Sequence, residues 1–85
     1  LERRMSNEFK ISLCTIDRVK DFCRITASIE PDLDIVVGRY IIDAKSIMGI
    51  FSIDLSRELT LKIKSDNIDE CKEIKEKLKE FIVEE

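Results

Sequence analysis

Four short stretches of the chain have the pattern of β-strands. Residues 9–14 and 58–64 alternate between hydrophobic and polar, which places every second side chain on one face of a strand. Residues 33–37 and 40–42 are instead rich in β-branched side chains, and they flank a two-residue loop at 38–39 that contains a glycine. Two such runs around a loop of this kind indicate a β-hairpin. The chain is therefore expected to form four strands, with a tight turn between the middle two.

Two longer stretches repeat their hydrophobic residues at intervals of three and four, which makes one face of an α-helix apolar. They cover residues 15–28, where Thr15 is the expected N-cap, and residues 68–82. A shorter apolar stretch, residues 47–53, follows Ser46 and is expected to form a third helix.

The order of these elements is β-α-β-β-α-β-α, which predicts an α+β fold. Each amphipathic helix has to bury its apolar stripe against another layer, so the helices are expected on one face of a four-stranded, mainly antiparallel sheet. A chain of 85 residues has room for one hydrophobic core of this kind. We expect a single domain over residues 5–85, and we interpret residues 1–4, which precede Met5, as an N-terminal extension.

The charged residues are mixed along the chain and give a net charge of -3, from 18 acidic and 15 basic side chains. Nucleic-acid binding is not expected, because no basic stripe is present to neutralise phosphates. No apolar run approaches the ~20 residues that span a bilayer, so membrane association is not expected either. The default interpretation is a cytoplasmic protein.

Few residues in the chain bear reactive groups. The chain contains no histidine, so it lacks the usual general base and the usual metal ligand. Its three cysteines, Cys14, Cys23 and Cys71, are far apart, without the paired spacing of a zinc or redox site. We expect each of them to be a buried apolar residue. The sequence therefore predicts no catalytic residue, no metal site and no cofactor, and a protein that is not an enzyme.

The segment DAKSIMGI, residues 43–50, contains one hydroxyl group beside a short apolar run. As a structural residue, Ser46 would accept a hydrogen bond from a backbone N–H of the following helix, which contributes about 1 kcal/mol. As a regulatory residue, it would carry a phosphate where the start of a helix favours negative charge. Ile47, Met48, Ile50 and Phe51 present a similar choice, because they either pack into the core or form part of an exposed apolar patch.

The stretch KSIMG, residues 45–49, lies between the third strand and the short helix and resembles the regulatory-serine motif of HPr, the phosphocarrier protein of the bacterial sugar phosphotransferase system. The similarity extends over residues 9–81 and implies the HPr-like open-faced β-sandwich. In HPr proteins of Gram-positive bacteria, this serine is phosphorylated by an ATP-dependent HPr kinase, and the phosphorylated form binds a catabolite-control transcription factor. The resemblance thus implies regulatory phosphorylation at Ser46.

The resemblance also implies a surface for partner proteins. In HPr, the residues after the serine form an apolar patch that docks enzyme I, the kinase or the transcription factor. By correspondence, Lys45, Ile47, Met48 and Phe51 are expected to contact partners, with Met48 and Phe51 exposed. Arg18 matches an arginine of the HPr active centre and is a further candidate, although a solvated residue on a charged helix explains it more simply.

One position departs from the HPr pattern. HPr receives phosphate from enzyme I on a histidine at the start of the first helix, and Ile16 occupies that position here. An isoleucine side chain has no lone pair to attack phosphorus, and it is expected to be buried. Histidine-type phosphocarrier activity is therefore not expected. In this respect the chain is similar to the catabolite-repression HPr paralogue, which also lacks the histidine and keeps the serine.

These observations leave three functions open. The first is an HPr-like regulatory or protein-binding domain that phosphorylation at Ser46 would switch. The second is a phosphocarrier component of the sugar phosphotransferase system, which the absence of histidine disfavours. The third is a purely structural interaction domain in which Ser46 only caps a helix. The expected partners are proteins, and the expected state is a monomer or a weak dimer.

Overall fold

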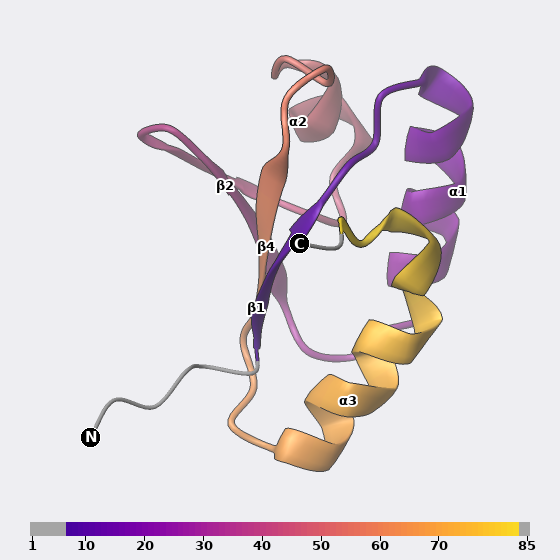
Figure 1. Cartoon of the computed structure of the whole chain (residues 1–85), viewed down its shortest axis with the longest axis vertical. Coiled ribbons are helices and arrows are strands. Elements are labelled where there is room, and N and C mark those ends of the chain that lie inside the picture. The colour runs from indigo at the N-terminus through magenta and orange to yellow at the C-terminus, as the bar shows by residue number, and fades with distance from the viewer. Residues whose placement is uncertain (1–6, 84–85) are drawn as a thin grey trace.

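The computed structural model describes residues 7–83, which form an open-faced sandwich with its helices on one face of a sheet (Figure 1). The strands are β1 (Glu8–Ile11), β2 (Leu33–Val37), β3 (Tyr40–Asp43) and β4 (Leu59–Ile63). The helices are α1 (Ile16–Thr26), α2 (Ile47–Phe51) and α3 (Ile68–Lys77), followed by a 3-10 turn, η1 (Lys79–Phe81). This order confirms the predicted α+β fold. The extension proposed for residues 1–4 lies outside the described residues.

All neighbouring strands of the sheet are antiparallel, in the order β1-β4-β2-β3. The two middle strands, β4 and β2, turn every second side chain towards the helices, and most of these side chains are fully buried. The inward positions are Leu33, Ile35, Val37, Leu59, Leu61 and Ile63. The positions between them, such as Asp34 and Lys62, lie on the face that the helices leave open. Because the strand order is β1-β4-β2-β3, the strands β1 and β3 are the two edges of the sheet.

The helices close the core from one side. α1 buries Val19 and Phe22, and α3 buries Cys71 and Ile74. Each pair lies three positions apart, as an amphipathic helix requires. The ring of Phe22 meets that of Phe81 edge to face, with 5.4 Å between the ring centroids. The first and last helical segments thus share one core.

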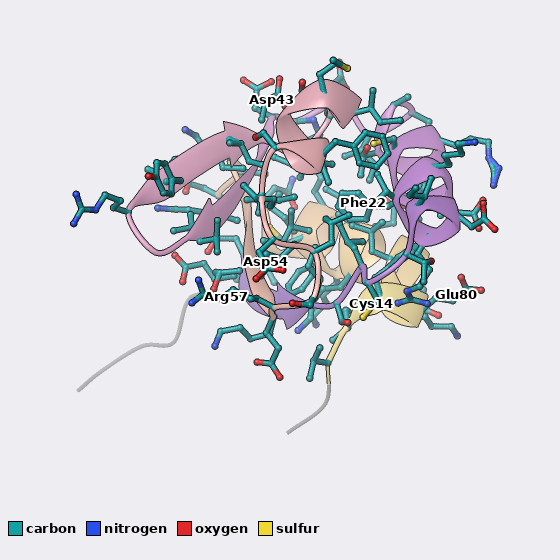
Figure 2. All side chains as sticks on the ribbon, turned by 90° about the horizontal axis from the view of Figure 1, so that it is seen from above. Cys14, Phe22, Asp43, Asp54, Arg57 and Glu80 are labelled. Carbon is teal, nitrogen blue, oxygen red and sulfur yellow. The ribbon has the colours of Figure 1, made fainter. Side chains whose placement is uncertain are left out.

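β2 and β3 form the predicted hairpin with a two-residue turn. Val37 pairs with Tyr40 across the turn, and Gly38, the first loop residue, has a φ of +59°. Glycine adopts this φ readily because it has no Cβ, and glycine at the first loop position is typical of a type II′ turn. The hairpin projects beyond the rest of the sheet in two perpendicular views (Figures 1 and 2).

The first strand is shorter than predicted, because it ends at Ile11 rather than at Cys14. The backbone turns sharply at Cys14, whose φ is +61°, and the Thr15 N–H donates to the Leu13 carbonyl oxygen at 2.6 Å, which closes a three-residue γ-turn. Cys14 is exposed and Cys23 is only half-buried, so the prediction that every cysteine is buried is wrong for these two residues. Cys71 is buried as predicted, and burial raises the pKa of its thiol.

The last helix also ends earlier than predicted, at Lys77 rather than at residue 82. Leu78 leaves the helical region with a φ of -106° and a ψ of 14°, a single 3-10 turn follows, and Ile82 is extended. The reason is that the chain then runs beside β1, where the Ser12 N–H donates to the Phe81 carbonyl oxygen at 2.8 Å.

Candidate protein-binding site around Ser46

Ser46 is the N-cap of α2, as predicted. Its backbone is extended, with a φ of -101° and a ψ of 108°, and its Oγ accepts a hydrogen bond from the Gly49 N–H at 3.1 Å. Its own N–H donates to the Asp43 carbonyl oxygen at 3.0 Å, which closes the turn between β3 and α2. Glycine at position 49 leaves room for this cap, because a Cβ there would lie 3.3 Å from the Ser46 Oγ.

α2 turns one side chain inward and three outward. Ile50 is fully buried, whereas 76% of Met48, 40% of Phe51 and 36% of Ile47 is exposed. These three residues are three or four positions apart or adjacent in the helix, so they share one stretch of its surface. The exposure predicted for Met48 and Phe51 is confirmed. We call Ile47, Met48 and Phe51 together the α2 patch.

Ile16 is the first residue of α1, and 59% of it is exposed. The prediction that this side chain is buried is wrong. Ile16 lies on the same face of α1 as Val19 and Phe22, but it is the first residue of the helix, and the buried part of this face begins one turn later, at Val19. α1 and α2 contact each other, and the start of α1 lies at the same end of the molecule as α2 (Figure 1). A further exposed apolar side chain is therefore found at this end.

Arg18 makes its contacts within the molecule. Its Nη2 donates to the Ser12 carbonyl oxygen at 2.8 Å and to the Glu80 carbonyl oxygen at 3.1 Å. The guanidinium carbon also lies 4.9 Å from the centroid of the Phe81 ring, within cation–π distance. Figure 2 shows this corner of the molecule, where Cys14 and Glu80 are labelled. One side chain thus holds together the loop before α1, α1 itself and η1.

Lys45 is also engaged within the molecule. Its ammonium group donates to the carbonyl oxygens of Ile29 and Glu30, in the loop after α1. Its backbone N–H donates to the Asp43 carboxylate at 2.9 Å. Lys45 is half-buried and ties the turn before α2 to the α1–β2 loop. Among the candidate contact residues, the α2 patch is exposed, while the two cations already bind backbone carbonyls.

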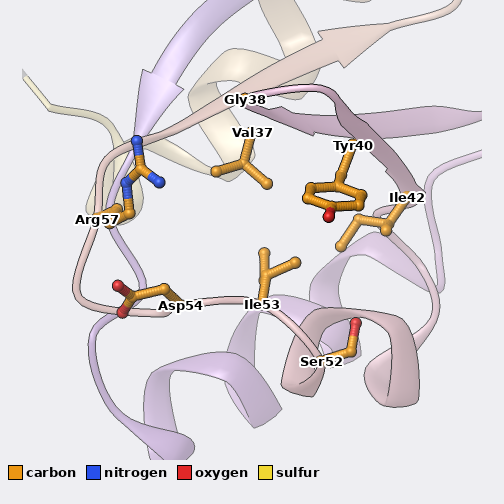
Figure 3. Close-up of a pocket in the computed structure, with 8 residues that line it drawn as sticks. All are labelled: Val37, Gly38, Tyr40, Ile42, Ser52, Ile53, Asp54 and Arg57. Atoms are coloured by element: carbon orange, nitrogen blue, oxygen red, sulfur yellow. The ribbon is translucent and has the colours of Figure 1, made fainter.

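An open groove of about 460 Å³ lies between the hairpin and the segment that leads from α2 to β4 (Figure 3). Apolar side chains from both sides line it, and Asp54 and Arg57 lie at one end. The Asp54 carboxylate accepts hydrogen bonds from the Ser56 Oγ at 2.7 Å and the Ser56 N–H at 3.0 Å, and these bonds lower the pKa of the carboxyl. Sequence reasoning missed the groove, because two segments far apart in the chain form it. The Asp-x-Ser turn at 54–56 was the local signal available.

Within residues 7–83, no group of three or more acidic or cysteine side chains is arranged to hold a metal ion. None of the helices in this part of the chain is long and apolar enough to cross a membrane.

Comparison with known proteins supports the fold. No protein-family model matches the chain, and no curated protein matches it in sequence. Among solved structures, it is similar to the crystal structure of HPr-C-His from Thermoanaerobacter tengcongensis, with a TM-score of 0.67 and 21% identity over 86% of this chain and 90% of that chain. The chain therefore has the HPr-like fold that the KSIMG motif implied. Because one fold serves many functions, function has to be argued from the residues at the site.

Proposed function

We propose that this chain is an HPr-like regulatory domain that acts by binding other proteins. The observation that carries the proposal is the α2 patch, three exposed apolar side chains that directly follow a capping serine. Exposed apolar groups that lie together gain free energy when a partner covers them. The flexible side chain of Met48 suits a surface that accepts more than one partner. The HPr-like fold supports the proposal, because the docking patch of that family also follows its regulatory serine.

In this proposal, the domain does not carry phosphate on a histidine. Ile16 stands at the corresponding position, and its hydrocarbon side chain cannot attack phosphorus. Arg18 binds two backbone carbonyls and lies over an aromatic ring, which accounts for it without phosphate chemistry. We place Arg18 and Lys45 at the border of the partner surface and the α2 patch at its centre.

Phosphorylation of Ser46 is the proposed switch. A phosphate on its Oγ would add about -1.5 to -2 charges and three acceptor oxygens beside the α2 patch. One of these oxygens can accept the hydrogen bond that the Gly49 N–H now donates to the hydroxyl, so α2 can stay formed. Asp43 lies in the same turn, so the phosphorylated turn would be strongly anionic. This form would favour a partner with basic side chains, such as the catabolite-control transcription factor that the HPr resemblance implies.

The switch is tested by incubating the chain with ATP and an HPr kinase and locating the phosphate by mass spectrometry. A single phosphate on Ser46 is expected, and it should be lost in Ser46→Ala. The matched control is Ser52→Ala, which removes a hydroxyl at the other end of α2, where the Ser52 Oγ donates to the Gly49 carbonyl oxygen at 2.6 Å. No incorporation into the wild-type chain would reject the switch and leave the binding proposal to its own test.

Binding is tested with an immobilised catabolite-control transcription factor and with enzyme I, using the phosphorylated and the unphosphorylated chain. Met48→Asp should weaken binding at least about tenfold, or ~1.4 kcal/mol, because it puts a charge into the α2 patch. The control is Ile68→Asp. Ile68 was predicted to belong to the apolar stripe of α3, yet it is 60% exposed, and α3 begins at the opposite end of the molecule (Figure 1).

Both changes place an aspartate in the first turn of a helix, where negative charge is favourable, so neither should unfold the domain. Equal losses of binding in the two variants would contradict a role for the α2 patch. Binding to neither protein, with or without phosphate, would contradict the proposed function. A transferable, acid-labile phosphate formed from phosphoenolpyruvate and enzyme I would instead favour the phosphocarrier alternative.

A further inference from the structure

The outer edge of β3 has no strand beside it within residues 7–83. The Ala44 N–H donates to the Leu33 carbonyl oxygen at 2.8 Å, so these two residues form a hydrogen-bonded pair next to the β2–β3 ladder. Hydrogen-bonded and non-hydrogen-bonded pairs alternate along antiparallel strands. The backbone groups of Ile41 and Asp43 therefore point away from β2, towards the open side, although the Asp43 carbonyl oxygen already accepts the Ser46 N–H at 3.0 Å.

The open edge is also apolar. Two residues of this edge have large exposed side chains: Tyr40 is 64% exposed and Ile41 is 67% exposed. Proteins usually protect an exposed edge with a lysine, a proline or a bulge, which prevents another strand from pairing with it. β3 has the sequence YIID and pairs with β2 in unbroken register, so it contains no lysine, proline or bulge, and its one charged side chain is Asp43 at its end. The edge is a template for one more strand.

Opposite charges flank the open edge. Arg39 precedes β3 and Asp43 ends it, and neither side chain forms an ion pair within residues 7–83. Asp43 lies opposite Asp34 on β2, and the Asp34 carboxylate is already bound by the Lys64 Nζ at 3.4 Å. Two carboxylates directly opposite each other are unfavourable, so a cation from outside the chain would stabilise this end of the hairpin.

We propose that two copies of this chain pair through β3, antiparallel, about a two-fold axis at Ile41. In this register the outward backbone groups of Ile41 meet those of Ile41 in the second copy, and Arg39 of each copy lies opposite Asp43 of the other. A shift of one residue would set outward groups against groups already bonded to β2. A shift of two residues in either direction would put Arg39 opposite Ile41 or Lys45. The charges and the backbone hydrogen bonds thus select the same register. In this register, a second copy of β3 provides both the complementary charges and the complementary backbone groups.

The pairing would join the two sheets into one, and it involves about five residues of each copy. An interface of this size lies below the ~1,000 Å² of a stable complex, so the dimer is weak. The pairing uses neither the Ser46 side chain nor the α2 patch, although Asp43 lies in the turn that the Ser46 N–H closes.

Sedimentation equilibrium from about 10 μM to about 1 mM tests the pairing, because Kd values in this range are expected of a small interface. Ile41→Lys should raise the dimer Kd at least tenfold, since it sets two ammonium groups opposite each other at the two-fold axis. Ile68→Lys makes the same change at an exposed isoleucine outside the edge and should leave the Kd unchanged. Hydrogen exchange should show the Ile41 amide becoming protected as the wild-type concentration rises.

Arg39→Asp tests the register without touching the strand, because residue 39 lies in the exposed turn. It should raise the Kd by placing two carboxylates opposite each other, whereas Arg39→Lys should not. A wild-type chain that stays monomeric up to about 1 mM would overturn the proposal. A dimer that neither Ile41→Lys nor Arg39→Asp weakens would overturn it equally.

Discussion

The two outer edges of the sheet differ in what covers them. Beside β1 runs the C-terminal segment, drawn in yellow in Figure 1. The Ser12 N–H donates to the Phe81 carbonyl oxygen at 2.8 Å, and the Val83 N–H donates to the Lys10 carbonyl oxygen at 2.9 Å. At the other edge, the outward groups of Ile41 face no strand within residues 7–83. Over the described residues, the chain closes one edge with its own backbone and leaves the other open.

The difference between the edges lies in side-chain anchors rather than in strand pairing alone. A few residues of added strand are marginally stable by themselves, so the closed edge needs support from the core. Phe81, which is 1% exposed, supplies this support, and Arg18 adds hydrogen bonds to the carbonyl oxygens of Ser12 and Glu80. Within residues 7–83, no comparable segment runs beside β3, because the chain turns at Asp43 into α2. Whether an edge is covered therefore depends on whether buried side chains hold another backbone segment beside it.

Removing the anchor of the closed edge should have the largest effect. Phe81→Ala deletes a ring whose centroid lies 5.4 Å from that of Phe22. The expected loss is about 3–5 kcal/mol of unfolding free energy, because the deletion leaves a cavity in the core. Urea unfolding measures it, with Phe51→Ala as the control. Since Phe51 is 40% exposed, its loss should be about 1 kcal/mol or less. Equal losses would mean that Phe81 is no anchor.

Arg18→Ala should weaken the closed edge by a smaller amount. The change removes charged hydrogen bonds to the carbonyl oxygens of Ser12 and Glu80, and a loss of about 1.5–3 kcal/mol is expected. Arg24→Ala is the matched control on the same helix. Its ion pair with Asp21 is exposed and should be worth less than about 1 kcal/mol. Similar values from thermal unfolding of the two variants would show that Arg18 is only a surface residue.

Ser46→Ala should loosen the turn that ends the open edge. The change removes the acceptor of the Gly49 N–H, and the expected loss is about 1 kcal/mol of unfolding free energy. Ser46→Thr keeps an oxygen at the cap and should recover most of it. If urea unfolding shows no difference between the two variants, the hydroxyl does not stabilise α2.

Ile41→Thr should have the smallest effect on the isolated chain. Its side chain is 67% exposed, and threonine also favours strands, so the free energy of unfolding should change by no more than about 0.5 kcal/mol. The free energy of unfolding should be measured at low protein concentration, where a weak dimer is dissociated. A loss above about 1 kcal/mol would show that the open edge is packed within one copy.

Features with short-range partners were predictable from the sequence. The caps at Thr15 and Ser46 bind N–H groups three residues later, and the hairpin turn needs only Gly38 and its flanking strands. The exposure of Met48 and Phe51 followed from the resemblance to HPr rather than from periodicity, because a helix of five residues is too short for an apolar stripe to show.

Features with distant partners were missed. Cys14 was expected in a strand, yet a γ-turn at this residue turns the chain towards α1 and leaves the thiol exposed. Ile16 was expected to be buried and is not, because it is the first residue of α1 and the buried part of the helix begins at Val19. The groove near Asp54 had no counterpart in the pattern, since its two sides come from separate segments.

By itself, the sequence determined the elements, their caps and which face of each is apolar. Only the tertiary structure decided which edge of the sheet is closed and what Arg18 does there, because the Glu80 carbonyl that it binds lies 62 positions along the chain. The physical reason is that hydrophobic spacing reports the apolar face of an element but not the element that it meets. Contacts between distant residues then decide which backbone groups stay open to a partner.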